Sequence, residues 1–135
     1  SYYPWWHGDL EALGRGLRHI ATRYRVPVMI VETAYPWTLE WIDEASNLLT
    51  ENTLIEGYPA TVEGQSRYLA DLTQLVMDAD GNGIVYWEPA WVSTECSTRW
   101  GQGSHWENAT FFDFNTGNEV LSSIDYMNRE YRRSD

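Results

Sequence analysis

The sequence predicts an α/β fold whose strands form a parallel sheet. Short apolar runs alternate with amphipathic helical patterns, so that a strand-helix unit recurs along the chain. Each long loop follows a predicted strand, whereas the connections from helix back to strand are short. This asymmetry is typical of a (β/α)8 TIM barrel, whose site is built by the loops after the strands. A doubly wound sheet shows it less strongly, and on the barrel interpretation the chain is the last portion of the barrel.

The first unit and the second strand are read from their apolar spacing. Residues 1–3 read as the end of a strand. A helix is expected from Asp9 to Arg25, because its apolar positions recur at the i, i+3, i+4, i+7 spacing and Asp9 is a suitable N-cap. Pro27 bars further helix. Residues 28–31 are a wholly apolar run of the kind that is buried on both faces of a parallel sheet.

The second and third units each include a long loop. Residues 34–60 carry turn formers and no sustained periodicity, and loops of this length are usually functional or disordered. A helix with Thr61 as its N-cap follows, and a tight turn at 78–83 leads to a third strand over 84–87. The second long loop covers residues 89–107.

The last stretch predicts a short extended piece over residues 111–114 and then a final helix. The helix is marked by apolar positions at Val120, Leu121, Ile124, Met127 and Tyr131. At its other end the sequence starts at Ser1, without a methionine and inside a predicted strand. We therefore expect the chain to be a segment of a longer protein, forming one part of a single domain.

Charge and composition exclude several classes of partner. The chain has 9 Lys and Arg against 20 Asp and Glu, a net charge of −11, whereas a phosphate backbone or an anionic membrane attracts cationic surfaces. No apolar stretch reaches the roughly 18 residues of a membrane span. The single cysteine, Cys96, permits no intrachain disulfide. We expect no nucleic-acid or membrane partner, and no protein partner is evident.

Aromatic residues gather around prolines at three places, residues 3–6, 35–37 and 87–91. Each cluster comes at or after the end of a predicted strand, and none of the 8 tryptophans falls in a predicted helix. The carboxyl ends of parallel strands meet at one end of the sheet, so these rings should gather there. Flat rings beside a carboxylate suit a carbohydrate, whose C–H faces stack on indole.

Glu32 is the sharpest catalytic candidate. It directly follows the apolar run at 28–31 and precedes the aromatic cluster at 35–37, which places it at the mouth of a barrel. Retaining glycosidases need one carboxylate as nucleophile and a second as acid/base, about 5 Å away. The alternative is a strand-end glutamate that is paired with a cation or solvated, and the surrounding rings favour the catalytic role.

Several collinear motifs resemble the endo-β-1,4-galactanases of glycoside hydrolase family 53. They are Glu-Thr-Ala-Tyr-Pro-Trp-Thr at 32–38, with residues 1–7, 57–65, 86–91 and 104–114. The resemblance covers essentially the whole chain. It implies a (β/α)8 barrel with its two catalytic glutamates on the fourth and seventh strands, of which this chain would supply strands six to eight with their helices. It also implies a secreted or periplasmic protein that degrades the arabinogalactan side chains of pectin.

The resemblance assigns Glu32 as the nucleophile of a retaining hydrolysis of β-1,4-galactan. Trp87 matches the aromatic floor under the sugar at the cleavage point. Tyr3 is placed to hydrogen-bond the nucleophile or to line that subsite; strand alternation puts Tyr3 and Tyr2 on opposite faces and leaves the choice between them open. Further substrate contacts are expected in the loops, with a plain packing role as the alternative for each, at Trp6, His7, Trp37 and Trp91.

The acid/base glutamate of the family has no counterpart in this sequence. Glu88 lies on the strand next to Glu32, but its Trp-Glu-Pro setting favours a residue that braces the loop, and alternation turns it away from the face of Trp87. The chain alone is therefore not expected to be a competent hydrolase.

No cofactor is required by this chemistry, and no metal ligand is assigned. The run at 78–83 imitates the start of an EF-hand loop, but Pro89 stands where a bidentate glutamate is needed. Some bacterial members of the family hold a structural calcium between the last long loops. Asp43, Glu44 and Asn47 lie in the corresponding loop, without a recognisable ligand pattern.

Three alternatives stay open at this point. The rings could form the platform of a non-catalytic carbohydrate-binding module, although such a module has no need of a carboxylate at position 32. A glycosidase of the same clan could act on another β-1,4-glycan, because nothing in the residues selects galactose over glucose, mannose or xylose. A half-barrel would expose strand edges and apolar faces, and would dimerise or aggregate.

Overall fold

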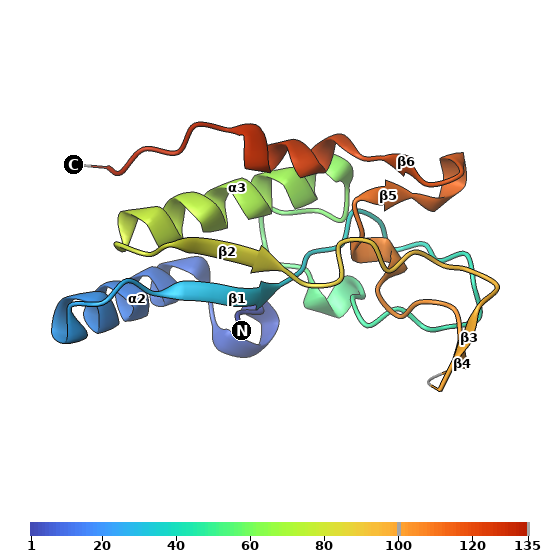
Figure 1. Cartoon of the computed structure of the whole chain (residues 1–135), viewed down its shortest axis with the longest axis horizontal. Helices are drawn as coiled ribbons and strands as arrows, with labels where there is room; N and C mark the ends of the chain where they lie inside the picture. The colour runs from blue at the N-terminus through green and yellow to red at the C-terminus, as the bar shows by residue number, and fades with distance from the viewer. Residues whose placement is uncertain (100, 135) are drawn as a thin grey trace.

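The computed structural model describes residues 1–99 and 101–134 as helices on one side of a small parallel sheet, with long loops at one end (Figure 1). The α-helices are α1 (Pro4–His7), α2 (Leu10–Tyr24) and α3 (Val62–Asp78), and the main strands are β1 (Met29–Thr33) and β2 (Gly83–Tyr86). Shorter pieces are the two-residue strands β3 (Ser97–Thr98), β4 (Gly101–Gln102), β5 (Phe112–Asp113) and β6 (Glu119–Val120), and the 3-10 turns η1 (Glu51–Thr53), η2 (Glu107–Ala109), η3 (Phe114–Thr116) and η4 (Ser122–Asn128).

The sheet is parallel, as the strand-helix order predicts. β1 pairs with β2, with Ile30 opposite Ile84, and the register then shifts so that Thr33 lies opposite Tyr86. The first three residues form no strand, although the Tyr2 N–H donates to the carbonyl of Glu32 at 2.9 Å and so lies along the free edge of β1. The predicted first strand is thus reduced to one backbone contact beside β1.

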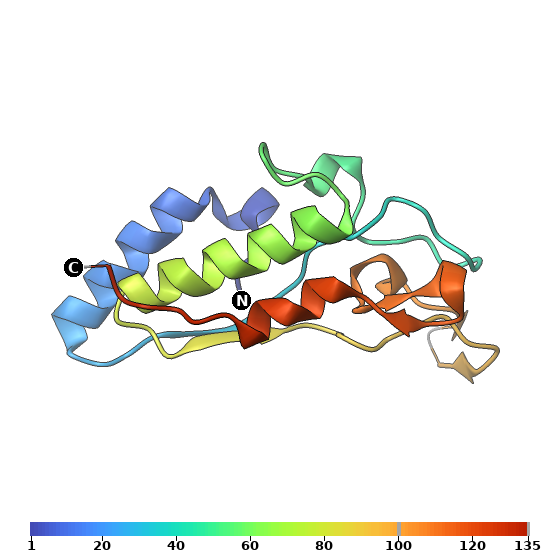
Figure 2. The same ribbon diagram turned by 90° about the horizontal axis from the view of Figure 1, so that it is seen from above.

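The two long helices cover only one face of this sheet (Figure 2). Ile30 is buried among side chains of α2 and α3, whereas Met29 and Val31 are 46% and 60% exposed on the other face. Val85 of β2 is also exposed on that side. The expectation that residues 28–31 are buried on both faces is therefore wrong for the described chain, because nothing in it covers the face opposite α2 and α3.

The helix ends follow from their capping residues. The Asp9 side chain accepts from the Ala12 N–H at 2.6 Å, and the Thr61 hydroxyl accepts from the Gly64 N–H at 3.0 Å, which confirms both predicted N-caps. α2 ends where Arg25 adopts a left-handed conformation with φ 55°.

Two predicted elements differ from the structure. Residues 4–7 form the one-turn helix α1, because Pro4 at its first position suits a helix start, and two tryptophans therefore lie in a helix. The final helix is replaced by β6 and the 3-10 segment η4. Val120 and Met127 are exposed there, since a 3-10 turn has three residues per turn and cannot bury an apolar stripe spaced for an α-helix. In the part of the chain that the structure describes, no helix has the length and apolarity to cross a membrane.

Gly64, in the first turn of α3, sits where no side chain fits. A Cβ at Gly64 would lie 1.9 Å from the backbone oxygen of Pro59, whereas a Cβ at exposed Gly16 of α2 would meet nothing within 4 Å. We expect Gly64→Ala to lower the free energy of unfolding by about 2 kcal/mol or more. The matched Gly16→Ala should raise it by roughly 0.5–1 kcal/mol. Urea unfolding of both variants checks this, and equal midpoints would contradict the close packing at Gly64.

Candidate active site

Glu32 is turned onto the open face of the sheet by an irregularity in β1. Ile30 and Thr33 both point toward the helices: Ile30 lies in the core, and the Thr33 hydroxyl is 3.1 Å from the hydroxyl of Tyr68 on α3. Residues three apart on a regular strand point to opposite faces. The register shift between Ile30 and Thr33 supplies the extra residue that reconciles them, and a bulge of this kind re-aims side chains. Half-buried Glu32, next to Thr33, therefore points away from α3.

Tyr3, and not Tyr2, has its side chain beside Glu32. The Tyr2 hydroxyl donates to the carbonyl of Gly8 at 2.8 Å. The buried Tyr3 hydroxyl makes no hydrogen bond of standard geometry within the described chain. Burial raises the pKa of the Tyr3 phenol, and the Glu32 carboxylate beside it raises that pKa further. The Tyr3 hydroxyl is thus neutral and lies at the side of the carboxylate.

A continuous aromatic surface surrounds Tyr3. Its ring lies 5.4 Å from that of Trp6 and 6.3 Å from that of Trp106, which in turn lies 6.5 Å from Trp87. Trp87 follows β2, and its N–H donates to the carbonyl of Thr33 at 2.8 Å, so it stands at the same end of the sheet as Glu32. Trp6 is 70% and Trp87 38% exposed, which leaves their faces available to a ligand.

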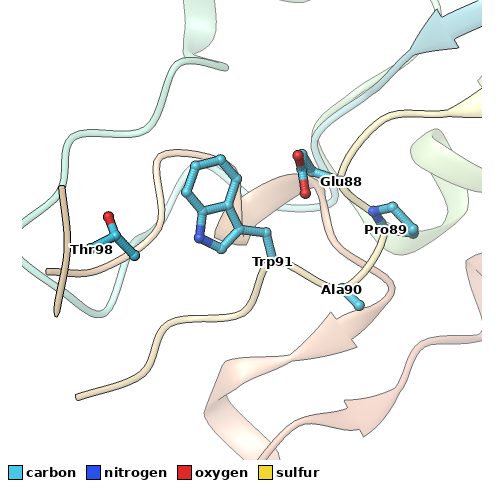
Figure 3. Close-up of a pocket in the computed structure, with 5 residues that line it drawn as sticks. All are labelled: Glu88, Pro89, Ala90, Trp91 and Thr98. Atoms are coloured by element: carbon cyan, nitrogen blue, oxygen red, sulfur yellow. The ribbon is translucent and has the colours of Figure 1, made fainter. Parts of the chain in front are cut away.

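The remaining loop candidates have different surroundings. Trp37 is buried and packs against Phe114 at 4.9 Å, so its ring offers little surface to a ligand. His7 is exposed, and its Nδ1 accepts from the Tyr3 N–H at 2.9 Å. Trp91 is half-buried and lines a separate pocket (Figure 3). The structure brings Tyr3, Trp6 and Trp87 to the end of the sheet where Glu32 lies, buries Trp37, and leaves Trp91 in its own pocket on the loop after Trp87.

Sequence reasoning missed Trp106 and Trp5. Trp106 bridges Tyr3 and Trp87, and Trp5 lies 5.0 Å from Tyr3. The sequence signals for Trp106 are its place in the motif at 104–114 and in a long loop after a strand, and neither names its partners. Its contact with Tyr3 spans more than a hundred positions. Such a contact cannot be read from local spacing.

A buried amide holds the loops around the site. The Gln65 side chain, on α3, donates to the carbonyls of Tyr35 and Ala109 at 2.8 and 3.1 Å. Its oxygen accepts from the Ser123 hydroxyl at 2.5 Å, and the Tyr86 hydroxyl donates to the Ala109 carbonyl at 2.6 Å. One side chain thus connects α3 with β1, β2 and the final segment. The loops leave the sheet from fixed positions as a result.

Two carboxylates tie the long loops to each other. Asp43 accepts hydrogen bonds from the backbone N–H of Ser104 at 2.7 Å, from that of Ala45 at 2.6 Å and from the hydroxyl of Ser93. Glu107 accepts from the Ile42 N–H at 2.7 Å. Burial raises the pKa of the Glu107 carboxyl, and the nearby charge of Asp43 adds to the rise. These bonds join the loop after β1 to the loop after β2.

The described part of this loop shows no cluster of carboxylates of the kind that holds calcium. Both Asp43 oxygens accept hydrogen bonds from N–H and O–H groups of the two loops. Glu44 is exposed, and the Asn47 side-chain N–H donates to the carbonyl of Glu40 at 3.2 Å. Among residues 1–99 and 101–134 no three His, Cys, Asp or Glu side chains come close enough to hold a metal. The tie between the loops is made by hydrogen bonds.

Glu88 does not brace its loop, contrary to the sequence-based expectation. Within the described residues its carboxylate makes no hydrogen bond and no ion pair, and it lines the pocket of Trp91 (Figure 3). The reason is local: Glu88 has φ 54°, which breaks the strand alternation directly after Trp87.

The model of glycosyl hydrolase family 53 matches residues 1–127. The chain belongs to glycosyl hydrolase family 53. The resemblance drawn from the motifs is thereby confirmed.

Relatives with assigned names agree with the family. The chain is 50% identical over 135 residues to an arabinogalactan endo-β-1,4-galactanase of Cellvibrio japonicus, covering 99% of this chain and 36% of that protein. It is 38% identical over 94 residues to an endo-β-1,4-galactanase of Bacillus subtilis, covering 68% of this chain and 22% of that protein. The chain thus spans about a third or less of the length of these relatives.

A solved structure shares the fold. The Ignisphaera aggregans GH53 catalytic domain superposes with a TM-score of 0.85 at 30% identity, over 98% of this chain and 38% of that one. A fungal β-1,4-galactanase gives a TM-score of 0.64 at 23% identity, over 91% of this chain and 34% of that one, which supports the fold alone. The helices and parallel strands described here are therefore those of a family 53 catalytic domain.

The buried Glu107 carboxyl predicts a pH-dependent stability. A raised pKa means that the folded state prefers the protonated acid, so its contribution to stability is present at low pH and is lost as pH rises through the raised pKa. Each unit of pKa elevation costs about 1.4 kcal/mol above that pH. Glu107→Gln keeps an oxygen for the Ile42 N–H and should gain stability over the parent as pH rises from 4 to 8. Thermal unfolding against pH measures this.

The control for that experiment is Glu44→Gln, an exposed carboxylate in the same loop. Its stability should follow that of the parent at every pH. If Glu107→Gln also followed the parent, the Glu107 carboxyl would have to be ionised at little cost in the fold.

Proposed function

We propose that the chain is the C-terminal part of the (β/α)8 catalytic domain of a retaining endo-β-1,4-galactanase, contributing strands six to eight and their helices. Three features support this. Residues 1–3, β1 and β2 follow one another side by side, with helices on one face only. The uncovered face carries the apolar side chains of Met29, Val31 and Val85, as the interior of a barrel would. The relatives and the solved catalytic domain are roughly three times as long.

The single observation that carries the catalytic proposal is the position of Glu32. Its carboxylate leaves the carboxyl end of β1 on the open face, beside Tyr3, and Trp87 stands at the same end of the sheet. In a retaining mechanism Glu32 attacks the anomeric carbon of a β-linked sugar and forms a covalent glycosyl-enzyme. Water then attacks that carbon, and the Glu32 carboxylate is released.

Tyr3 and the tryptophan rings assist this reaction without forming covalent bonds to the sugar. The neutral Tyr3 hydroxyl donates toward the Glu32 carboxylate and holds it in the orientation for attack. Trp87 forms the floor under the reacting sugar, and Trp6 and Trp106 continue the apolar wall on which further sugar units stack.

The acid that protonates the leaving sugar is supplied from outside the described residues. Retaining hydrolysis needs a second carboxyl group about 5 Å from the nucleophile. Glu88 is a poor candidate, because it lines the separate pocket of Trp91. We therefore place the acid/base on an earlier strand of the barrel, as in the family resemblance, and propose that this chain by itself has no hydrolase activity.

The substrate proposal is β-1,4-galactan in arabinogalactan, the polymer that gives the Cellvibrio japonicus relative its printed name. The polysaccharide lies outside cells, so the protein is proposed to be secreted or periplasmic and to act in the breakdown of pectin side chains. A net charge of −11 is compatible with a neutral polymer as ligand.

The test of the nucleophile is Glu32→Gln in the full-length protein. The amide keeps the shape of the side chain but cannot attack, so hydrolysis of β-1,4-galactan should fall by several orders of magnitude while galactan binding is largely kept. Glu63→Gln, an exposed carboxylate in the first turn of α3, serves as the matched control and should hydrolyse at the parental rate. Near-normal turnover by Glu32→Gln would require another nucleophile.

The hydrogen-bonded tie between the loops predicts that no metal is needed. Because Asp43 is occupied by donors from its own loop and the next, treatment of the full-length protein with EDTA should leave both galactan hydrolysis and the melting temperature unchanged. A drop in melting temperature that calcium restores would show that a cation, and not these hydrogen bonds, joins the loops.

A further inference from the structure

Glu88 has a backbone conformation that needs an explanation. Its φ of 54° lies in the left-handed region, which residues other than glycine adopt only at an energetic cost. The chain is pinned on both sides: the Trp87 N–H donates to the Thr33 carbonyl at 2.8 Å, and the Pro89 carbonyl accepts from the Phe111 N–H at 2.9 Å. A glycine would satisfy this turn without strain, yet a glutamate occupies it.

The side chain of Glu88 offers no internal compensation for this strain. Its carboxylate is half-buried and makes no hydrogen bond or ion pair with residues 1–99 or 101–134. Strained residues without a structural reason concentrate at functional sites, where the conformation aims a side chain at a ligand. The left-handed turn therefore indicates that the direction of the carboxylate matters outside the fold itself.

The carboxylate is aimed into a pocket of about 540 Å³. Figure 3 shows the Glu88 carboxylate and the Trp91 ring on the same side of the turn formed by Pro89 and Ala90, and Thr98 of β3 lies beyond the ring. The pocket has the size of small-ligand sites in proteins. Its walls combine a flat apolar ring with an ionised acceptor.

This pairing suits one class of ligand. A sugar unit presents C–H groups on its faces, which pack on indole, and hydroxyl groups on its rim, which donate to a carboxylate. An anionic ligand is disfavoured by Glu88 itself and by the net charge of −11. A neutral glycan uses both walls at once.

We propose that Glu88 is a sugar-binding residue, whose carboxylate accepts hydrogen bonds from the hydroxyls of a sugar unit stacked on Trp91. This inference rests on the proposed function and adds a polar specificity contact in the pocket of Trp91, on the loop that directly follows Trp87. Trp87 and Glu88 are consecutive, so the floor of the reacting sugar and this acceptor are fixed by the same turn after β2. Glu88 contributes to binding and leaves bond cleavage to Glu32.

The test uses the full-length protein with Glu32→Gln, so that ligand is bound and not cleaved. Its affinity for a β-1,4-galactooligosaccharide is measured by titration calorimetry, with and without Glu88→Gly. Glycine suits the left-handed turn, so the melting temperature should stay the same or rise. The affinity should fall by about tenfold or more, the value of hydrogen bonds to a charged group. Glu88→Gln, which keeps one carbonyl acceptor, should fall between the two.

The matched control is Arg25→Gly. Arg25 has nearly the same backbone, φ 55°, but ends α2 at the opposite end of the molecule from the loops (Figure 1). It should show the same gain or constancy of melting temperature with unchanged affinity. This separates relief of backbone strain from loss of a ligand contact.

Three outcomes would overturn the inference. Unchanged affinity in Glu88→Gly would make the carboxylate a solvated group, and a fall in its melting temperature would make Glu88 a structural residue. If the Glu32→Gln parent bound no galactooligosaccharide while remaining folded, the proposed function would fail together with the Glu88 contact. A parent that binds and a Glu88→Gly variant that binds equally well would remove the Glu88 contact alone.

Discussion

β1 has one extra residue between Ile30 and Thr33, so side chains of this short strand reach both the helical core and the open face of the sheet. Ile30 packs into the core under the helices, and Thr33 reaches the hydroxyl of Tyr68 on α3. In an unbroken strand residues 30 and 32 share a face, and the carboxylate of Glu32 would lie among apolar side chains at a large desolvation cost. The bulge removes that conflict and places Glu32 on the open face, which is where the proposed chemistry needs it.

The rest of the structure holds this end of the sheet in place. Fully buried Gln65 fixes the points at which the chain leaves β1 and β2, and Asn108 donates to the carbonyls of Thr38 and Leu49 at 3.0 and 2.9 Å. Because these groups are buried, each unmade bond would carry a desolvation penalty. Long loops with few helices or strands can therefore carry rings in fixed positions, as a stacking surface requires. Glu88, with its left-handed backbone, belongs to the same end of the sheet, because it directly follows Trp87.

The features predicted correctly from the sequence are those that interactions between nearby residues determine. The N-caps Asp9 and Thr61, the long helices and the parallel order follow from side-chain hydrogen bonds and periodicity within a few residues. The prediction of a final helix was wrong, because the apolar residues from Val120 onward lie in and before a 3-10 segment that packs on α3. The bulge at Glu32 and the bridge made by Trp106 depend on partners far along the sequence, so no local pattern contains them. The sequence placed Glu32 correctly at the end of a strand. The direction of its side chain could be determined only from the structure.

The most direct measurement is covalent capture of the nucleophile in the full-length protein. An activated 2-fluoro β-1,4-galactobioside forms a glycosyl-enzyme that water releases slowly, because the fluorine destabilises the cationic transition state of the second step. Mass spectrometry of peptides from the inactivated protein then locates the sugar. We predict a single added glycosyl group, on Glu32. A glycosyl group on any other carboxylate would contradict this assignment. Product release with no covalent glycosyl-enzyme at any residue would also contradict it.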